Sequence, residues 1–348
     1  MTTESTIKRT VYLDILRIIA IFAVVWLHTA AQDFRNCYPS DEWMVKNVYD
    51  TLSRWAVPVF VMISGALFLD AERRVNTRRL FSHNILRLVV IYVVWSTVLT
   101  LHKGVAGMSI GEVVQKIIDG PIHLWFLKML IGLYVLVPIL RVITRKRTTE
   151  EYFLAVVMVM GIVIPTVAKL LQVFCPAISE SFSSLIDSIE LTVSTRFVTY
   201  FVLGHYLHRF SLTKRARLMI YMSAVMSVVA VTWLTAYASS LAGKTDTMFY
   251  DCDNVFTLFE SIAVFIAMRN ARVSKNIQPT LTTAARLSLG VYVLHIPVLT
   301  FFIHRTVGMG ETMGWVLFVP GLAIMVFICT YVAVAILGKI PGIRKLVM

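Results

Sequence analysis

Ten apolar stretches, each about as long as a membrane-spanning helix, constrain the fold of this chain more than any other feature. Inside a bilayer every backbone hydrogen bond must be made within the protein, so such stretches predict α-helices. We therefore expect an all-α, polytopic membrane protein with about ten transmembrane helices in a single domain, residues 1–348. The expected spans cover residues 11–31, 51–69, 80–101, 122–140, 152–174, 191–208, 217–238, 255–268, 286–304 and 315–338.

Composition agrees with a membrane protein and excludes an ordinary soluble one. The chain is 57% hydrophobic and only 15% charged, and its mean hydropathy is +0.75. A net charge of +13 indicates nucleic-acid binding only where the basic residues gather on a soluble face. Here they flank the apolar stretches, so we expect no nucleic-acid partner.

The basic residues are divided unequally between the two sets of connecting segments. Twenty-two lie on one side and six on the other, which by the positive-inside rule predicts that both termini are cytoplasmic. We expect a multi-pass protein of the bacterial cytoplasmic (inner) membrane, in contact with membrane lipid. The larger set includes Lys8, Arg9, Arg73 and Arg74. The expected outer loops are residues 32–50, 102–121, 175–190, 239–254 and 305–314.

The first stretch carries three ionisable residues, Asp14, Arg17 and His28. Arg17 and His28 are eleven residues apart, so on a helix they return to within ~20° of the same face, ~16 Å apart along the axis. Exposing each of these groups to lipid would cost roughly several kcal/mol of free energy. They should therefore face a protein interior or an aqueous cavity. We expect this segment to be retained as a span, since a cleaved leader does not normally carry such charges in its apolar core.

These residues also form a recognisable pattern, Leu13-Asp14-x-x-Arg17 followed by ten residues and His28. In this pattern and in three later segments the chain resembles the acyltransferase-3 family of integral-membrane O-acyltransferases. The resemblance implies a membrane acyltransferase in which Arg17 and His28 are catalytic residues. The later segments are residues 53–65 (SRWAVPVFVMISG), 123–126 (HLWF) and 289–295 (LGVYVLH).

His28 and Arg17 suit the chemistry of acyl transfer. Imidazole titrates near neutrality, so His28 can remove a proton from a sugar hydroxyl as that hydroxyl attacks a thioester. Arg17 can bind a phosphate or carbonyl of coenzyme A, or stabilise charge developing on the thioester oxygen. The alternatives are a hydrogen-bonded interfacial histidine and a structural ion pair between Arg17 and Asp14. We expect Asp14 chiefly to orient Arg17 at the substrate site.

Six further residues lie where they can contact an acceptor in or near the outer half of the membrane. Basic side chains there suit hydroxyl-rich or anionic ligands, such as a sugar on a lipid phosphate. The alternative to substrate binding is membership of an ordinary interfacial aromatic belt for Trp125 and packing between helices for His295. The predicted substrate-binding residues are Arg54, Trp125, Lys128, Arg196, Glu260 and His295.

An arginine-rich segment joins the second and third spans. Topology and anionic headgroups explain most of its arginines. In the acyltransferase-3 family an arginine pair in this loop is implicated in the reaction, with Arg-x-x-Arg spacing in some members. This chain lacks that spacing, so the resemblance implies only Arg79 and Arg87 as contacts for acetyl-CoA phosphates.

No motif for a metal or phosphate site is present in the sequence. It lacks a phosphate-cradling glycine loop and a Cys or His pair at metal spacing, so we expect no metal and no tightly bound cofactor. Three of the four cysteines fall in expected outer loops, which leaves either one disulfide or free thiols.

Together these features predict a membrane O-acetyltransferase. It would move an acetyl group from cytoplasmic acetyl-CoA to a hydroxyl of an envelope glycan or its lipid-linked precursor. One alternative is a proton-coupled carrier or exporter of a small polar or glycolipid substrate, with His28, Glu260 and His295 as its relay. A second is a non-catalytic scaffold, in which buried Arg17 and His28 would be an unexplained cost.

Overall fold

The computed structural model describes residues 11–70, 76–188, 195–306 and 308–347. Lys8, Arg9, Arg73 and Arg74 of the predicted cytoplasmic set lie outside these residues. The described helices are α1 (Val11–Ala30), α2 (Asp41–Thr51), α3 (Ala56–Phe68), α4 (Thr77–Arg79), η1 (Leu80–Ile85), α5 (Leu86–His102), α6 (Ile110–Asp119), η2 (Ile122–Leu124), α7 (Trp125–Ile143), α8 (Arg147–Met158), η3 (Val159–Val163), α9 (Ile164–Phe174), α10 (Pro176–Ser188), α11 (Arg196–Arg209), α12 (Lys214–Ala242), η4 (Met248–Tyr250), α13 (Val255–Arg269), η5 (Lys275–Ile277), α14 (Gln278–Ile303), α15 (Met309–Met313), α16 (Trp315–Leu337) and α17 (Arg344–Val347).

The protein is an all-α polytopic membrane protein. The part that the structure describes contains no strand, and eight of its helical segments are long and apolar enough to cross a membrane. These segments agree with eight of the ten predicted spans. The second and ninth begin earlier than predicted, at Asp41 instead of residue 51 and at Lys275 instead of residue 286.

The sixth and eighth predicted spans correspond to the shorter helices α11 and α13, of 14 and 15 residues. Most of α11 is buried, so it lies within protein and does not need to span lipid alone. His205, which interrupts the apolar pattern there, is paired with Glu150 of α8 at 2.6 Å, and both side chains are buried. A buried ionisable side chain requires such a partner. The polar residue that interrupts the apolar pattern therefore joins α11 to α8.

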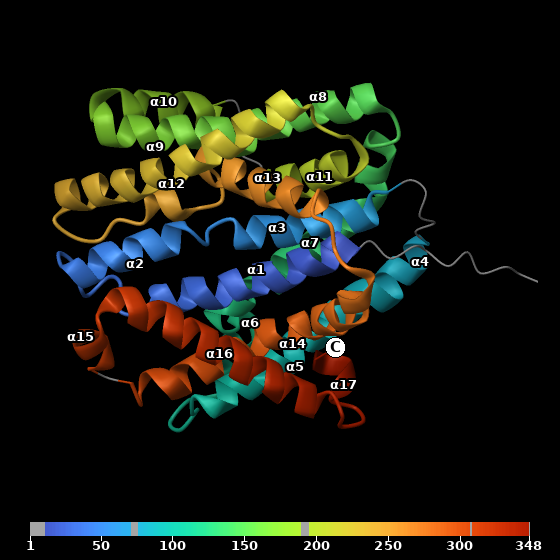
Figure 1. The fold of residues 1–348 in the computed structure, drawn as a ribbon, viewed down its shortest axis with the longest axis vertical. Coiled ribbons are helices and arrows are strands. Elements are labelled where there is room, and N and C mark those ends of the chain that lie inside the picture. The colour runs from blue at the N-terminus through green and yellow to red at the C-terminus, as the bar shows by residue number, and fades with distance from the viewer. Residues whose placement is uncertain (1–10, 71–75, 189–194, 307, 348) are drawn as a thin grey trace, which may run out of the picture.

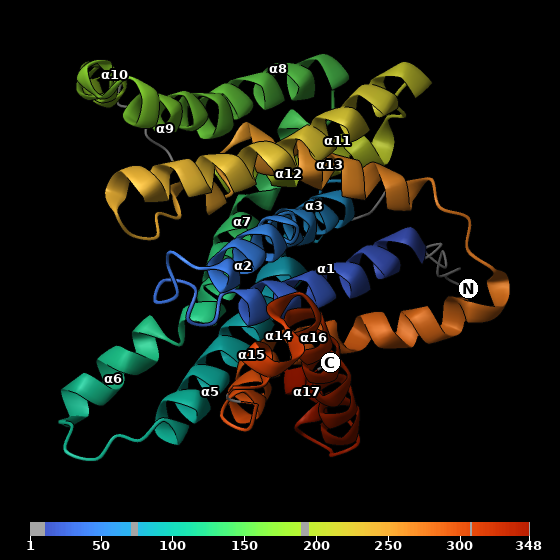
Figure 2. The same ribbon diagram turned by 60° about the vertical axis from the view of Figure 1, so that its left-hand side comes forward.

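Helix α1 lies at the centre of the bundle. It packs against α3 on one side and against α14 and α16 on the other (Figure 1). Figure 2 shows α8, α9 and α10 forming an outer layer beyond α12, whereas α5 and α6 lie on the opposite side of α1. The polar residues of α1 therefore face other helices, as their cost in lipid requires.

Helices α3 and α11 approach each other more closely than ordinary side chains allow. A Cβ atom on Gly65 would lie 1.7 Å from the carbonyl oxygen of Phe201, and one on Gly204 would lie 2.1 Å from that of Met62. Small residues permit this backbone contact between membrane helices. The crossing fixes the position of α3, which forms one wall of the main cavity.

Several predicted outer loops are helical, which corrects their assignment as loops. Residues 32–50 contain most of α2, and residues 102–121 contain α6. The Ser40 side chain caps α2 by accepting from the Trp43 backbone, and Ser109 with Glu112 forms a capping box on α6. Helix α2 belongs with α3 to one candidate span, Asp41–Phe68, whereas α6 lies in none of the candidate spans and is not detected by hydropathy.

Candidate functional site

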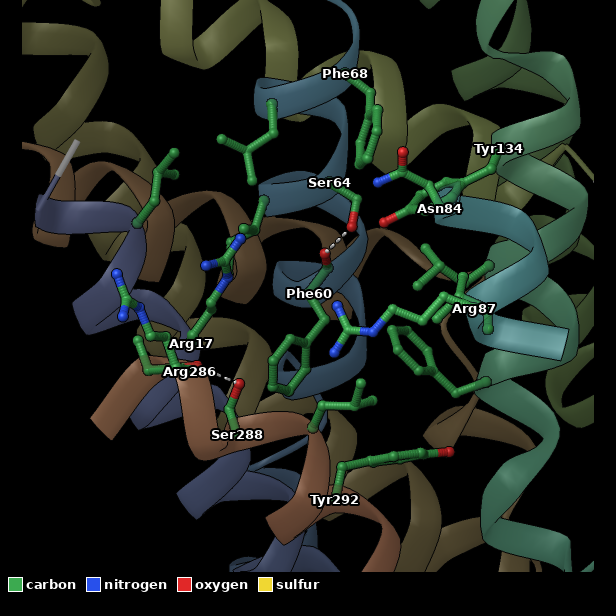
Figure 3. A pocket seen from close by; sticks show the side chains of 18 of the residues that line it. Arg17, Phe60, Ser64, Phe68, Asn84, Arg87, Tyr134, Arg286, Ser288 and Tyr292 are labelled. Carbon is green, nitrogen blue, oxygen red and sulfur yellow. Dashed lines mark hydrogen bonds between the residues drawn. The ribbon is translucent and has the colours of Figure 1, made fainter. Parts of the chain in front are cut away.

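A cavity of about 570 Å³ lies between α1, α3, η1 and the start of α5, α7 and α14. Figure 3 shows Arg17 of α1 and Arg87 of α5 pointing into it from opposite walls. Its size suits an organic ligand rather than a single ion. The lining residues are Leu13, Asp14, Arg17, Phe60, Ile63, Ser64, Leu67, Phe68, His83, Asn84, Arg87, Leu88, Phe126, Leu130, Tyr134, Ala285, Arg286, Ser288, Leu289 and Tyr292.

The polar lining of this cavity is cationic. Arg17, Arg87 and Arg286 all contribute to it, and Asp14 is the one carboxylate among the described lining residues. Asp14 is buried, lies 3.5 Å from the Arg17 guanidinium and accepts a hydrogen bond of 3.1 Å from Thr282. The Arg17 side chain keeps 30% of its surface exposed. Arg17 can therefore keep its ion pair with Asp14 and still contact an anion in the cavity.

The short π-helix η1 shapes the wall that carries Arg87. The side chain of Asn76 caps the preceding turn by accepting from the Arg79 backbone at 3.3 Å, and the chain then widens into η1 before α5 begins. A π-helical turn shifts the side chains after it around the helix axis and occurs frequently at functional sites. Here η1 supplies His83 and Asn84 to the cavity, directly before Arg87.

Aromatic rings line one end of the cavity. Tyr292 lies at that end in Figure 3, and its ring centroid is 5.6 Å from that of Phe126. The Tyr292 hydroxyl donates a hydrogen bond to the backbone oxygen of His123. Tyr292 is buried. It lines the cavity and, through its hydroxyl, also contacts the segment that contains His123.

Three histidines from three helical segments gather behind Tyr292. The ring of His295 lies 6.0 Å from the ring of Tyr292, 5.1 Å from that of His28 and 5.6 Å from that of His123, measured between centroids. His295 and His123 are buried, while His28 is half-buried. The structure therefore brings the predicted residues His28 and His295 together, next to the cavity that contains Arg17.

A second polar cluster surrounds Arg54. Its guanidinium forms an ion pair with buried Asp50, donates to the backbone oxygen of Tyr250 at 3.2 Å and stacks over the Tyr250 ring at 4.1 Å. Glu260 is also buried, and one of its oxygens has no hydrogen-bond partner among the described residues. The Arg54 guanidinium thus already contacts Asp50 and Tyr250. Its role in substrate binding stays a prediction.

The other predicted binding residues lie outside the cavity lining. Trp125 is partly exposed and packs against Phe197, while Lys128 donates to the backbone oxygen of Asp119 at 2.9 Å. Arg196 lies 3.8 Å from Asp253. Arg79 is exposed on α4. Arg79 and Arg87, predicted as equivalent contacts, therefore differ, because only Arg87 lines the cavity.

The sequence did not single out four residues that the structure places at the site: Arg286, Ser288, Tyr292 and His123. Arg286 was counted only as a flanking basic residue. Tyr292 and His123 lie inside two of the segments that carry the family resemblance. That position was the one sequence signal by which they could have been found. No spacing along the chain could show that His123 of η2 meets Tyr292 of α14, since 169 residues separate them.

Comparison with known proteins gives one match. The sequence matches the family model described as an acyltransferase domain, of the acyltransferase-3 type, over residues 10–334. Searches of curated proteins and of solved structures found no match. The matched region contains Arg17, His28, the cavity and the three histidines.

Proposed function

Because the chain belongs to the acyltransferase-3 family and is therefore an acyltransferase, we propose that it transfers an acetyl group from cytoplasmic acetyl-CoA to a cell-envelope glycan. The acceptor is a hydroxyl of the glycan or of its lipid-linked precursor. One observation carries this proposal. A cationic cavity shares helix α1 with His28, and its aromatic end adjoins the three histidines.

The cavity supports a donor site because its charge matches that of coenzyme A. Phosphates bind best where several guanidinium groups converge and few carboxylates compete. Arg17, Arg87 and Arg286 provide that arrangement, and the positive-inside rule predicts that this end of α1 is cytoplasmic. Acetyl-CoA would enter there, with its phosphates against the arginines and its thioester directed toward Tyr292.

In this proposal His28 acts as the general base of the transfer. It takes the proton of the acceptor hydroxyl while the hydroxyl oxygen bonds to the carbonyl carbon, and the carbon–sulfur bond then breaks. The proton passes to the leaving thiolate, which leaves as coenzyme A. Arg17 lies ~16 Å from His28 along α1, a separation that favours phosphate binding over contact with the reacting carbonyl.

The acceptor side of the proposal rests on the sequence pattern. The proposed likeness of residues 53–65, 123–126 and 289–295, in order and separation, to the enterobacterial common antigen O-acetyltransferase would make an envelope glycan the acceptor. Arg54, Lys128 and Arg196 would contact a sugar or lipid phosphate in the outer half. Trp125 offers a partly exposed ring for stacking on a sugar.

The proposal is tested by acetyl transfer from radiolabelled acetyl-CoA into lipid-linked and polymeric glycans. Membranes would carry wild type, His28→Ala or Arg17→Ala at equal protein level. We expect label in glycan with wild type and none with His28→Ala, while Arg17→Ala raises the KM for acetyl-CoA. If wild type labels no glycan, or if both variants match it, the proposal fails. The proton-coupled carrier is then tested by substrate movement without an acyl donor.

A further inference from the structure

The hydrogen bonds of His295 determine which of its ring nitrogens carries a proton. Its Nδ1 lies 2.6 Å from the backbone oxygen of Tyr292. A carbonyl oxygen can only accept, so Nδ1 must be the protonated, donating nitrogen. In a neutral imidazole the other nitrogen then has a lone pair. That nitrogen, Nε2, is buried and has no hydrogen-bond partner in the described part of the chain.

His123 cannot supply the missing donor. Its Nε2 lies 3.2 Å from the backbone oxygen of Val293, so the same argument makes Nε2 the donor and leaves a lone pair on Nδ1. The ring of His123 packs edge-on against His295, at an interplanar angle of 83°. His123 therefore helps to hold the plane of the His295 ring, but it does not satisfy Nε2.

His28 is the neighbouring ring with an uncommitted N–H group. Its ring accepts and donates no hydrogen bond among the residues that the structure describes, and a hydrogen bond from Gln32 reaches only its backbone oxygen. The 5.1 Å between the His28 and His295 centroids lets the two nitrogens reach hydrogen-bond distance, about 2.7–3.2 Å, through a small rotation of the half-buried ring.

We propose that His295 is a positioning residue for His28, with its buried Nε2 accepting a hydrogen bond from an N–H of the His28 ring. This bond fixes the tautomer of His28, so the other nitrogen presents a lone pair to the acceptor hydroxyl. The inference rests on the proposed function, in which His28 is the general base. His295 gains no proton during the transfer, since the hydroxyl proton passes through His28 to the leaving thiolate.

A neutral partner suits this position in the membrane. In many hydrolases a carboxylate orients the catalytic histidine and stabilises its charged form. Here no described carboxylate is hydrogen-bonded to His28, and an added carboxylate would carry the cost of a charge within the bilayer. A histidine whose donor side is anchored to Tyr292 provides an oriented acceptor without that charge.

Two substitutions at His295 separate the role of Nε2 as a hydrogen-bond acceptor from the role of Nδ1 as a donor to Tyr292. In His295→Asn the amide NH₂ can replace Nδ1 and keep the bond to Tyr292, but nothing replaces Nε2. In His295→Gln the longer side chain can put its amide oxygen near Nε2 as an acceptor. We expect kcat to fall about 10- to 100-fold in His295→Asn, with both KM values unchanged, and to stay near wild type in His295→Gln. His304→Asn, an exposed histidine directly after the same helix, is the matched control and should leave kcat unchanged.

Three results would overturn the inference: wild-type kcat in His295→Asn, equal loss in the Asn and Gln variants, or a rise in KM in place of a fall in kcat. Nitrogen-15 NMR of histidine-labelled wild type provides a test that needs no folded variant. We expect an N–H···N hydrogen bond between two imidazoles, and its absence overturns the inference. Failure of wild type to transfer an acyl group overturns instead the proposed function, so the two failures are distinguishable.

Discussion

The close contact between α3 and α11 makes Gly65→Ala a sharp test of the packing. The added methyl carbon would lie 1.7 Å from the Phe201 carbonyl oxygen, half the 3.4 Å at which ordinary contact begins. The obstacle is helix backbone, which cannot rotate away as a flexible side chain can. The two helices must separate, and α3 carries Phe60 and Ser64 of the cavity wall.

We expect Gly65→Ala to destabilise the protein by about 3 kcal/mol, the upper end of the range for overpacked cores. The melting temperature of the purified protein in detergent should fall by at least about 5 °C. Because α3 moves with the methyl group, acyl-donor binding should weaken as well. Thermal unfolding followed by tryptophan fluorescence measures the first effect, and the KM for the donor measures the second.

Gly132→Ala is the matched control, since a Cβ atom there would meet nothing within 4 Å on the exposed side of α7. Alanine is the better helix former by about 1 kcal/mol, so this variant should melt at or above the wild-type temperature. Gly204→Ala introduces the same clash from the other helix and should behave like Gly65→Ala. Equal melting temperatures for Gly65→Ala and Gly132→Ala would refute the reasoning.

Three further predictions follow from single sites. Burial raises the pKa of the Cys252 thiol to about 12, so at neutral pH it holds little reactive thiolate and should label with maleimide more slowly than exposed Cys175; equal rates by mass spectrometry would contradict this. Hydrogen bonds within the capping box lower the pKa of Glu112 below 4.5, so its stabilisation of α6 is present above that value and lost as pH falls through the lowered pKa. Glu112→Ala should therefore speed hydrogen exchange in α6 at neutral pH and have no effect well below that pKa; a pH-independent difference would argue against the capping role. Arg87→Ala should raise the KM for the acyl donor about tenfold, whereas Arg78→Ala, on the exposed face of α4, should not; similar effects would indicate a general response to charge.

The sequence was sufficient to predict the eight candidate membrane spans, because hydropathy and length reflect the cost of exposing backbone and polar groups to lipid. Hydropathy was insufficient to describe helices that do not have to cross the lipid bilayer by themselves. Short α11 is buried by its neighbours, and α6 lies in a predicted loop. The capping box of α6, Ser109-x-x-Glu112, is a readable signal of a helix start that hydropathy alone overlooks.

For the site, the sequence predicted the residues of one helix better than their partners. Helical periodicity indicated that Arg17 and His28 share a face, and the structure puts Arg17 in the cavity with His28 beyond its aromatic end. Arg286 and His123 could not be found in this way, because their positions near Arg17 and His28 depend on how α14 and η2 pack beside α1.

The position of Tyr292 bears on how far water can reach along the central helix α1. A continuous water-filled path lined by charged residues would conduct protons and discharge the gradient across the bilayer. The buried phenol ring of Tyr292 lines the cavity that contains Arg17 and lies 6.0 Å from the ring of His295, the neighbour of His28; an apolar ring next to such groups can interrupt a water column. Ionisable groups distributed along one central helix therefore need not form one continuous aqueous path across a bilayer.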